Sequence, residues 1–152
     1  MLDQDDLVRE SLNMVIMEVV DWFNSIANNN VILHYSDKEL PLTSIYRNKL
    51  TGAIKMVIMN ALNSIGENGD IYIQPDIRDN NVYLSIADTG EGLSNEKRRQ
   101  SFEPFVMDVD SAQLRGMGLV KWIVELHGGK VKINSRLSKG TEVIMNIPAD
   151  VS

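Results

Sequence analysis

The chain contains no cysteine, so disulfides, zinc sites built on thiolates and thiol nucleophiles are excluded within it. It has only two histidines, His34 and His127, which lie far apart in the sequence and lack the spacing of metal ligands. Lysine and arginine form no block, and the net charge is −6 with a pI near 4.9. We therefore expect neither nucleic acid nor a membrane surface as a direct partner.

The sequence also lacks a secretory signal and an apolar run long enough to span a bilayer. We expect a cytoplasmic protein, although a parent protein from which this chain was cut could be membrane-anchored. The hydrophobic content of 43% and the charged content of 24% are typical of a globular domain. Because no repeat, linker or low-complexity segment divides the chain, we expect residues 1–152 to form a single domain.

Apolar periodicity predicts three long helices, over residues 5–27, 46–65 and 116–127. In the first of them, a smaller apolar set lies off the main apolar arc and consists of Leu7, Met14 and Met17. This set indicates either a broad buried face or a surface that docks a partner. The main arc itself consists of Val8, Leu12, Val15, Val19, Trp22, Phe23 and Ile26.

Alternating segments predict five strands, over residues 31–35, 71–73, 82–86, 130–136 and 142–147. The second and third form a hairpin across residues 78–81, and Pro75 indicates that the first strand of this hairpin lies at a sheet edge or frays there. Tight turns between consecutive strands favour a mixed, mostly antiparallel sheet with the helices on one face. The predicted fold class is α+β, a two-layer α/β sandwich.

Asp88 follows the strand over residues 82–86 and precedes Gly90 and Gly92. Glycines leave the backbone bare, so a flat ligand can approach closely. A carboxylate held beside them accepts hydrogen bonds from an exocyclic amine, and desolvation makes that contact discriminating. An ordinary glycine turn capped by the aspartate is the alternative interpretation.

Asn60 lies on the second predicted helix, where Met56, Asn60 and Asn63 border the buried face. An asparagine at such a boundary either bonds to neighbouring backbone or offers its carbonyl to a hard cation such as Mg²⁺. Gly116 and Gly118 enter the third helix and present backbone N–H groups to an anion, although this pattern is frequent. The helices alone leave these alternatives open.

In this order the motifs resemble the ATP-binding domain shared by sensor histidine kinases, DNA gyrase, MutL-type repair proteins and the large heat-shock chaperones. The resemblance covers about residues 2–148, and the segments 102–105 and 123–129 are similar to the histidine-kinase branch. The motifs that carry it are Asn60-Ala61, Asp88-Thr89-Gly90-Glu91-Gly92, Phe102-Glu103-Pro104-Phe105, Gly116-Met117-Gly118-Leu119 and Lys139-Gly140-Thr141.

The resemblance implies that ATP and Mg²⁺ are bound. Asn60 would ligate the Mg²⁺, Asp88 would bond the adenine amino group, and Thr141 would join through water. Residues 106–115 would form an ATP lid hinged by residues 102–105. The ATP-binding residues expected from it are Asn60, Asn63, Asp88, Gly90, Gly92, Phe105, Arg115, Gly116, Met117, Gly118, Leu119 and Thr141, with Asn60 as the metal ligand.

The chain also departs from the family pattern. Met56 stands where family members often carry a second asparagine, and where the ATPases and the anti-sigma-factor kinases carry a glutamate that activates water. A thioether cannot accept that proton, so efficient hydrolysis is not expected. Asn63 and Ser64 replace the lysine and aromatic residue of many kinases, and Arg115 alone remains of the basic residues in the lid.

The resemblance implies transfer of the γ-phosphate to a histidine on a separate helical dimerisation and phosphoacceptor domain, with a response regulator downstream in a two-component system. His34 and His127 are expected to be structural, so no phosphoacceptor is identified in the chain. One alternative is a degenerate, non-catalytic nucleotide-binding or docking module of the same fold. The other is a stand-alone protein kinase of the anti-sigma-factor type.

Overall fold

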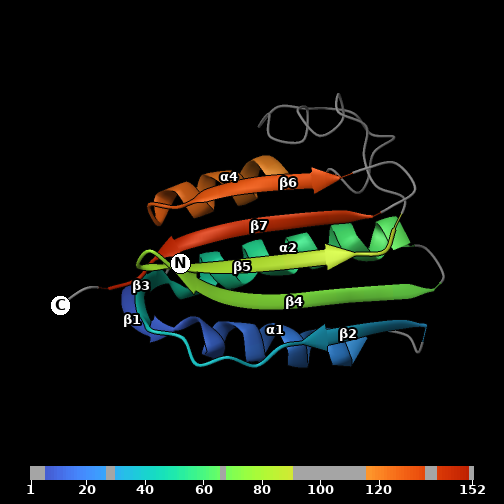
Figure 1. Cartoon of the computed structure of the whole chain (residues 1–152), viewed down its shortest axis with the longest axis horizontal. Helices are drawn as coiled ribbons and strands as arrows, with labels where there is room; N and C mark the ends of the chain where they lie inside the picture. Colours follow the sequence, from blue (N-terminus) through green and yellow to red (C-terminus); the bar gives the residue numbers. More distant parts are fainter. Residues whose placement is uncertain (1–5, 27–29, 66–67, 91–115, 136–139, 151–152) are drawn as a thin grey trace, which may run out of the picture.

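The structure is a computed structural model that describes residues 6–26, 30–65, 68–90, 116–135 and 140–150. In these ranges three helices and seven strands are present (Figure 1). The helices are α1 (Leu12–Ile26), α2 (Arg47–Ile65) and α4 (Met117–Leu126). The strands are β1 (Leu7–Ser11), β2 (Val31–Tyr35), β3 (Leu42–Tyr46), β4 (Gly69–Arg78), β5 (Asn81–Asp88), β6 (Lys130–Ser135) and β7 (Thr141–Pro148).

Five strands form one sheet in the order β2-β4-β5-β7-β6, in which the β2–β4 pairing is parallel and the others are antiparallel. Figure 1 shows the three helices on one face of this sheet. The predicted α+β sandwich, with its mixed and mostly antiparallel sheet, is therefore confirmed. The core fills the space between the two layers.

The central strand β5 shows why the alternating pattern predicted the sheet correctly. Val82, Leu84 and Ile86 are buried beneath the helices, whereas Tyr83 and Ser85 face the other side. The turn that joins β4 to β5 places Asp79 at φ 50° and Asn80 at φ 62°. Such left-handed residues match the twist of a two-residue hairpin and suit asparagine and aspartate.

Pro75 lies in β4, which is an interior strand, so the expectation of an edge strand is wrong for the strand as a whole. β2 ends at Tyr35, opposite Ile73, and the Ser36 N–H donates to the Ile73 carbonyl (3.1 Å). Residues two apart in a strand point their backbone groups to the same side, so Pro75 lacks its N–H on the side where β2 has already ended. The proline therefore costs no hydrogen bond.

The first helix begins later than predicted, because β1 occupies the start of the segment expected to be helical. β1 pairs antiparallel with β3, a strand that the sequence did not predict. Ser11 ends β1, and its hydroxyl accepts a hydrogen bond from the Asn13 N–H (3.2 Å). This N-cap starts α1 at Leu12.

The off-arc set on the first segment is exposed, with 56% of Leu7, 55% of Met14 and 46% of Met17 accessible to solvent. The interpretation of a broad buried face is therefore wrong, and the docking surface stays a prediction. Ile26, predicted to be in the arc, is exposed as well. None of the described helices is both long and apolar enough to cross a membrane.

Candidate nucleotide-binding site

A pocket that is open to solvent lies between α2, α4 and the sheet, and the empty space in and at the mouth of it amounts to about 400 Å³. It contains four of the residues that the sequence predicted, Asn60, Asp88, Met117 and Thr141, which come from α2, β5, α4 and β7. Its walls are completed by Val57, Ala61, Ser64, Ile86, Ile133 and Val143. The pocket is therefore mostly apolar, with a few polar groups, as small-molecule sites are.

Asp88 is the last residue of β5 and lies opposite Thr141 of β7. Its Oδ1 accepts a hydrogen bond from the Gly90 N–H (2.7 Å). Burial raises the pKa of the Asp88 carboxyl to about 6, although hydrogen bonds from the Gly90 and Thr141 backbone act in the opposite direction. No lysine or arginine of the described chain lines the pocket to compensate this carboxylate. An N–H donor on a bound ligand would find a strong acceptor there.

Gly90 and Gly140 hold the backbone around Asp88. A Cβ on Gly90 would lie 2.1 Å from the Ser64 hydroxyl of α2, so only glycine lets the chain pass this close to the helix. Gly140 has a φ of 87°, and a Cβ there would lie 2.1 Å from the Asp88 carbonyl oxygen. Gly140, directly before β7, thus packs closely against the end of β5.

Asn60 is 9% exposed and lines the pocket from the C-terminal half of α2. Its amide oxygen is a hard donor of the kind that Mg²⁺ accepts, so this residue fits a magnesium ligand. Among the described residues, no group of three or more histidine, aspartate or glutamate side chains could hold a metal ion.

α4 begins beside this pocket. Gly116, with a φ of 86°, is its N-cap and has no side-chain capping bond, and Met117 in the first turn lines the pocket. A Cβ on Gly116 would lie 2.6 Å from the Met56 sulfur, so α2 and the start of α4 approach closely. Gly118 is half-buried in the first turn of α4, whereas Leu119 is 54% exposed and lies outside the pocket lining.

Asn63 is exposed, so the expectation that it borders the buried face is wrong. Ser64, which sequence reasoning passed over, lines the pocket instead. Ser64 follows Asn60 by four residues and therefore shares its helix face, whereas Asn63 is turned by about 100° from Ser64. Helical spacing was the signal that could have identified Ser64.

Three predicted binding residues, Gly92, Phe105 and Arg115, lie outside the described residues. The predicted hinge (residues 102–105), the predicted lid (residues 106–115) and a short helix expected at residues 95–100 also lie outside them. These assignments stay predictions.

Residues 38–151 match the family of histidine kinase-, DNA gyrase B- and HSP90-like ATPases. Sporulation kinase D of Bacillus subtilis is 29% identical over 137 residues, which are 90% of this chain but 27% of that kinase. The catalytic domain of the histidine kinase ThkA is similar at 26% identity and a TM-score of 0.81, over 94% of this chain and 95% of that domain. ThkA in complex with the response regulator protein TrrA matches with a TM-score of 0.78, at 24% identity, over 95% of this chain and 42% of that one.

The family match covers most of the chain, and the similar proteins agree with it in sequence and in fold. The chain belongs to the family of histidine kinase-, DNA gyrase B- and HSP90-like ATPases, as an ATP-binding catalytic domain of the sensor histidine kinase type.

Proposed function

We propose that this chain binds Mg²⁺-ATP and presents the γ-phosphate to a histidine on a separate helical dimerisation and phosphoacceptor domain. That domain would belong to the same parent protein or act in trans, and a response regulator would then receive the phosphoryl group. The complex of ThkA with TrrA supports such a regulator as partner. Since this chain spans 27% of Sporulation kinase D, the acceptor domain is sought outside it. We place the reaction in the cytoplasm, where ATP is available.

The Asp88 carboxylate carries this proposal. It lines a mostly apolar pocket, and burial raises the pKa of its carboxyl to about 6. A carboxylate in that state is a strong acceptor for an N–H group of a ligand, and the adenine amino group is such a donor. Asn60 in the same pocket would offer its amide oxygen to the Mg²⁺ that accompanies the phosphates.

The chain's own contribution to phosphoryl transfer would be positioning. The acceptor imidazole nitrogen forms the new bond to the γ-phosphorus, and the bond to the β,γ-bridging oxygen breaks to leave ADP. Met56, half-buried beside Gly116, has no group that could take a proton from water, so the phosphoryl group is kept for the acceptor.

Two titrations and one transfer assay test the proposal. Calorimetry with ATP, with and without Mg²⁺, should show saturable binding that weakens in Asp88→Asn. ATP labelled on the γ-phosphate, mixed with the chain and a helical acceptor domain, should then label the acceptor histidine. An absence of binding at millimolar ATP would contradict the proposal.

One observation favours the second candidate, a non-catalytic nucleotide-binding or docking module. Within the part of the chain that the structure describes, no cationic side chain lines the pocket, and Met56 replaces a polar residue near the phosphate side. Such a module would bind adenosine and ATP with similar affinity and would label no acceptor. The transfer assay therefore separates the two candidates.

A further inference from the structure

His127 joins the end of α4 to the start of α2. It follows Leu126 as the C-cap residue of α4. Its Nδ1 lies 2.7 Å from the Ile123 carbonyl oxygen, and its Nε2 lies 2.9 Å from the backbone nitrogen of Tyr46. Tyr46 is the last residue of β3 and directly precedes α2. The imidazole therefore links the end of α4 to a residue that lies 81 positions earlier in the sequence.

The two partners fix the tautomer of this ring. A backbone N–H can only donate, so Nε2 must accept the bond from Tyr46. Nδ1 must then carry the proton that is donated to the Ile123 carbonyl oxygen. The phenol ring of Tyr46 meets the imidazole edge-on, with 5.6 Å between centroids and a 73° interplanar angle. The ring is thus bonded at both nitrogens.

These bonds restrain the position of α4 along α2, in addition to the packing of its buried apolar face. The Nδ1 bond fixes the ring to its own helix, and the Nε2 bond fixes that helix to the residue before α2. α4 has only ten residues, so a displacement at its end is transmitted to its beginning. There Met117 lines the pocket and Gly116 lies against Met56 of α2.

We propose that His127 is a positioning residue for the phosphate side of the nucleotide site. It holds the start of α4 in place relative to Asn60 without itself touching the ligand. The adenine side depends on Asp88 and Thr141, which belong to β5 and β7 and are held by their own backbone pairing. Loss of the His127 bonds should therefore weaken contacts to phosphates and leave contacts to the base intact. This inference rests on the proposed function.

The experiment measures the affinities for adenosine and for Mg²⁺-ATP separately. His127→Phe keeps a ring and removes both bonds, whereas His127→Gln restores an oxygen that can accept from the Tyr46 N–H. We expect the phenylalanine variant to bind ATP about three- to tenfold more weakly, with adenosine unchanged within about twofold. The glutamine variant should recover ATP binding. His127→Asn, whose shorter amide does not reach Tyr46, replaces the phenylalanine variant if that variant does not fold.

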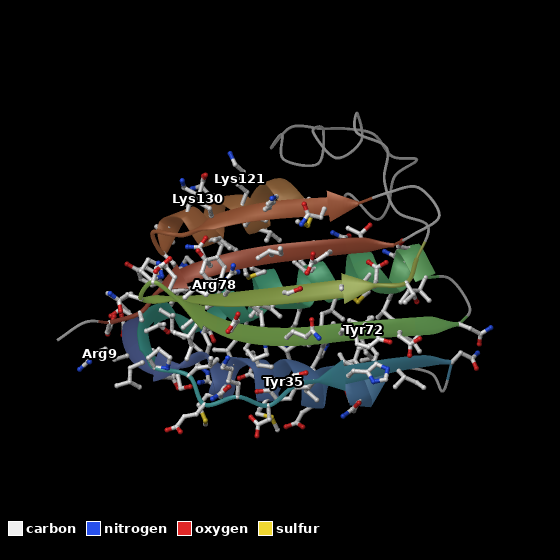
Figure 2. The ribbon with its side chains drawn as sticks, viewed as in Figure 1. Arg9, Tyr35, Tyr72, Arg78, Lys121 and Lys130 are labelled. Atoms are coloured by element: carbon white, nitrogen blue, oxygen red, sulfur yellow. The ribbon has the colours of Figure 1, made fainter. Side chains whose placement is uncertain are left out.

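Tyr35→Phe is the matched control. It removes the bond from the Tyr35 hydroxyl to Asn13 (3.1 Å) at the β2 and α1 edge of the molecule. Figure 2 shows Tyr35 at that edge, away from Lys121 and Lys130, which mark the α4 and β6 edge. This variant should lose some stability and keep both affinities.

The inference is overturned if His127→Phe, or His127→Asn in its place, keeps the wild-type ratio of ATP affinity to adenosine affinity. It is also overturned if His127→Gln binds ATP as weakly as His127→Phe does. A wild-type chain that binds neither ligand would instead refute the proposed function, and with it this inference. A wild-type chain that binds both while the ratio stays unchanged in the variants refutes the role of His127 alone.

Discussion

Replacing Asp88 with asparagine should stabilise the fold near pH 7 and at the same time weaken binding of adenosine. The carboxylate is partly removed from water at the end of β5, and burial raises its pKa from 3.8 to about 6. Asparagine has nearly the same shape and keeps an oxygen for the Gly90 N–H, but it carries no charge to desolvate. Its NH₂ group would meet the adenine amino group as a second donor, so the ligand contact is lost.

The sign and the size of the stability effect follow from the pKa. Because the folded state holds the Asp88 proton more tightly than the unfolded chain, the contribution of this group is fully present below about pH 3.8. It is lost as the pH rises through about 6. The pKa difference of about two units corresponds to about 3 kcal/mol, and solvent that reaches the half-buried side chain reduces this to about 1.5–3 kcal/mol.

Urea or thermal unfolding of both proteins between about pH 4 and pH 8 measures the effect. The stability of the asparagine variant relative to wild type should rise between about pH 4 and pH 6 and stay constant above, with a Tm difference of about 3–10 °C. Asp76→Asn is the control of opposite sign, because hydrogen bonds from Lys38 and the Ile77 backbone lower the pKa of Asp76. Asp76 ionises below about pH 3.8, so the stability of that variant relative to wild type should stay constant between about pH 4 and pH 8 and should fall with rising pH only below that range, which unfolding at about pH 2–4 measures.

A stability difference that stays flat from about pH 4 to pH 7 would refute the reasoning, since it would mean that the Asp88 carboxylate is not desolvated. Calorimetric titration of adenosine adds the second half of the test. If Asp88→Asn binds adenosine as tightly as wild type does, Asp88 is not the acceptor for the amino group, whatever its effect on stability.

Four further predictions concern the site and its surroundings. The affinity for adenosine should be at least about tenfold higher than the affinity for inosine, because the inosine carbonyl would face the Asp88 carboxylate. Competition binding measures this difference. Gly140→Ala should lower the free energy of unfolding in urea by about 2 kcal/mol or more, because the φ of Gly140 is 87° and a Cβ there would meet the Asp88 carbonyl. Gly52→Ala is the control: a Cβ there has nothing within 4 Å, so this change should stabilise α2 by about 0.5–1 kcal/mol. Asn60→Ala should abolish the Mg²⁺-dependent part of ATP affinity and leave binding in EDTA unchanged, as titration with and without the metal shows. Changing the exposed Met14 and Met17 to serine should reduce labelling of a supplied acceptor domain without altering ATP affinity, and unaltered labelling would contradict a docking role for this surface.

Most of the fold could be predicted because long elements carry strong periodicity. The helix of residues 46–65 and the hairpin around residues 78–81 were found within a few residues of their observed bounds. The β1–β3 pair was missed because its two strands are short and 31 or more residues apart. β1 is also largely exposed, so the sequence has no buried apolar face there that would indicate a strand. Ser11 was the local signal for the start of α1, but its role as N-cap is visible only in the structure, through its bond with the Asn13 N–H.

The candidate site could be predicted where a polar residue stands next to an apolar run. It could not be predicted where rotation about a helix axis decides which side chain faces the pocket. Asn60 and Asp88 stood out as polar groups next to apolar runs, and both line the pocket. Asn63 was predicted to border the buried face and Ser64 was not considered, but one residue along a helix is about 100° of rotation. That rotation leaves Asn63 in solvent and turns Ser64 toward Gly90.

The position of the last two strands in the sheet decides which residues complete the site. The residue types between these strands do not determine which of the two lies next to β5. The β6–β7 pair could dock on β5 through either strand. In the structure β7 lies next to β5, so Thr141 faces Asp88 and Gly140 lies against the Asp88 backbone. With β6 in that place, Ser135 or its neighbours would meet Asp88, and neither Thr141 nor Gly140 would contribute. The order β5-β7-β6 therefore brings Thr141 into the pocket beside Asp88 and places Gly140 against the Asp88 backbone.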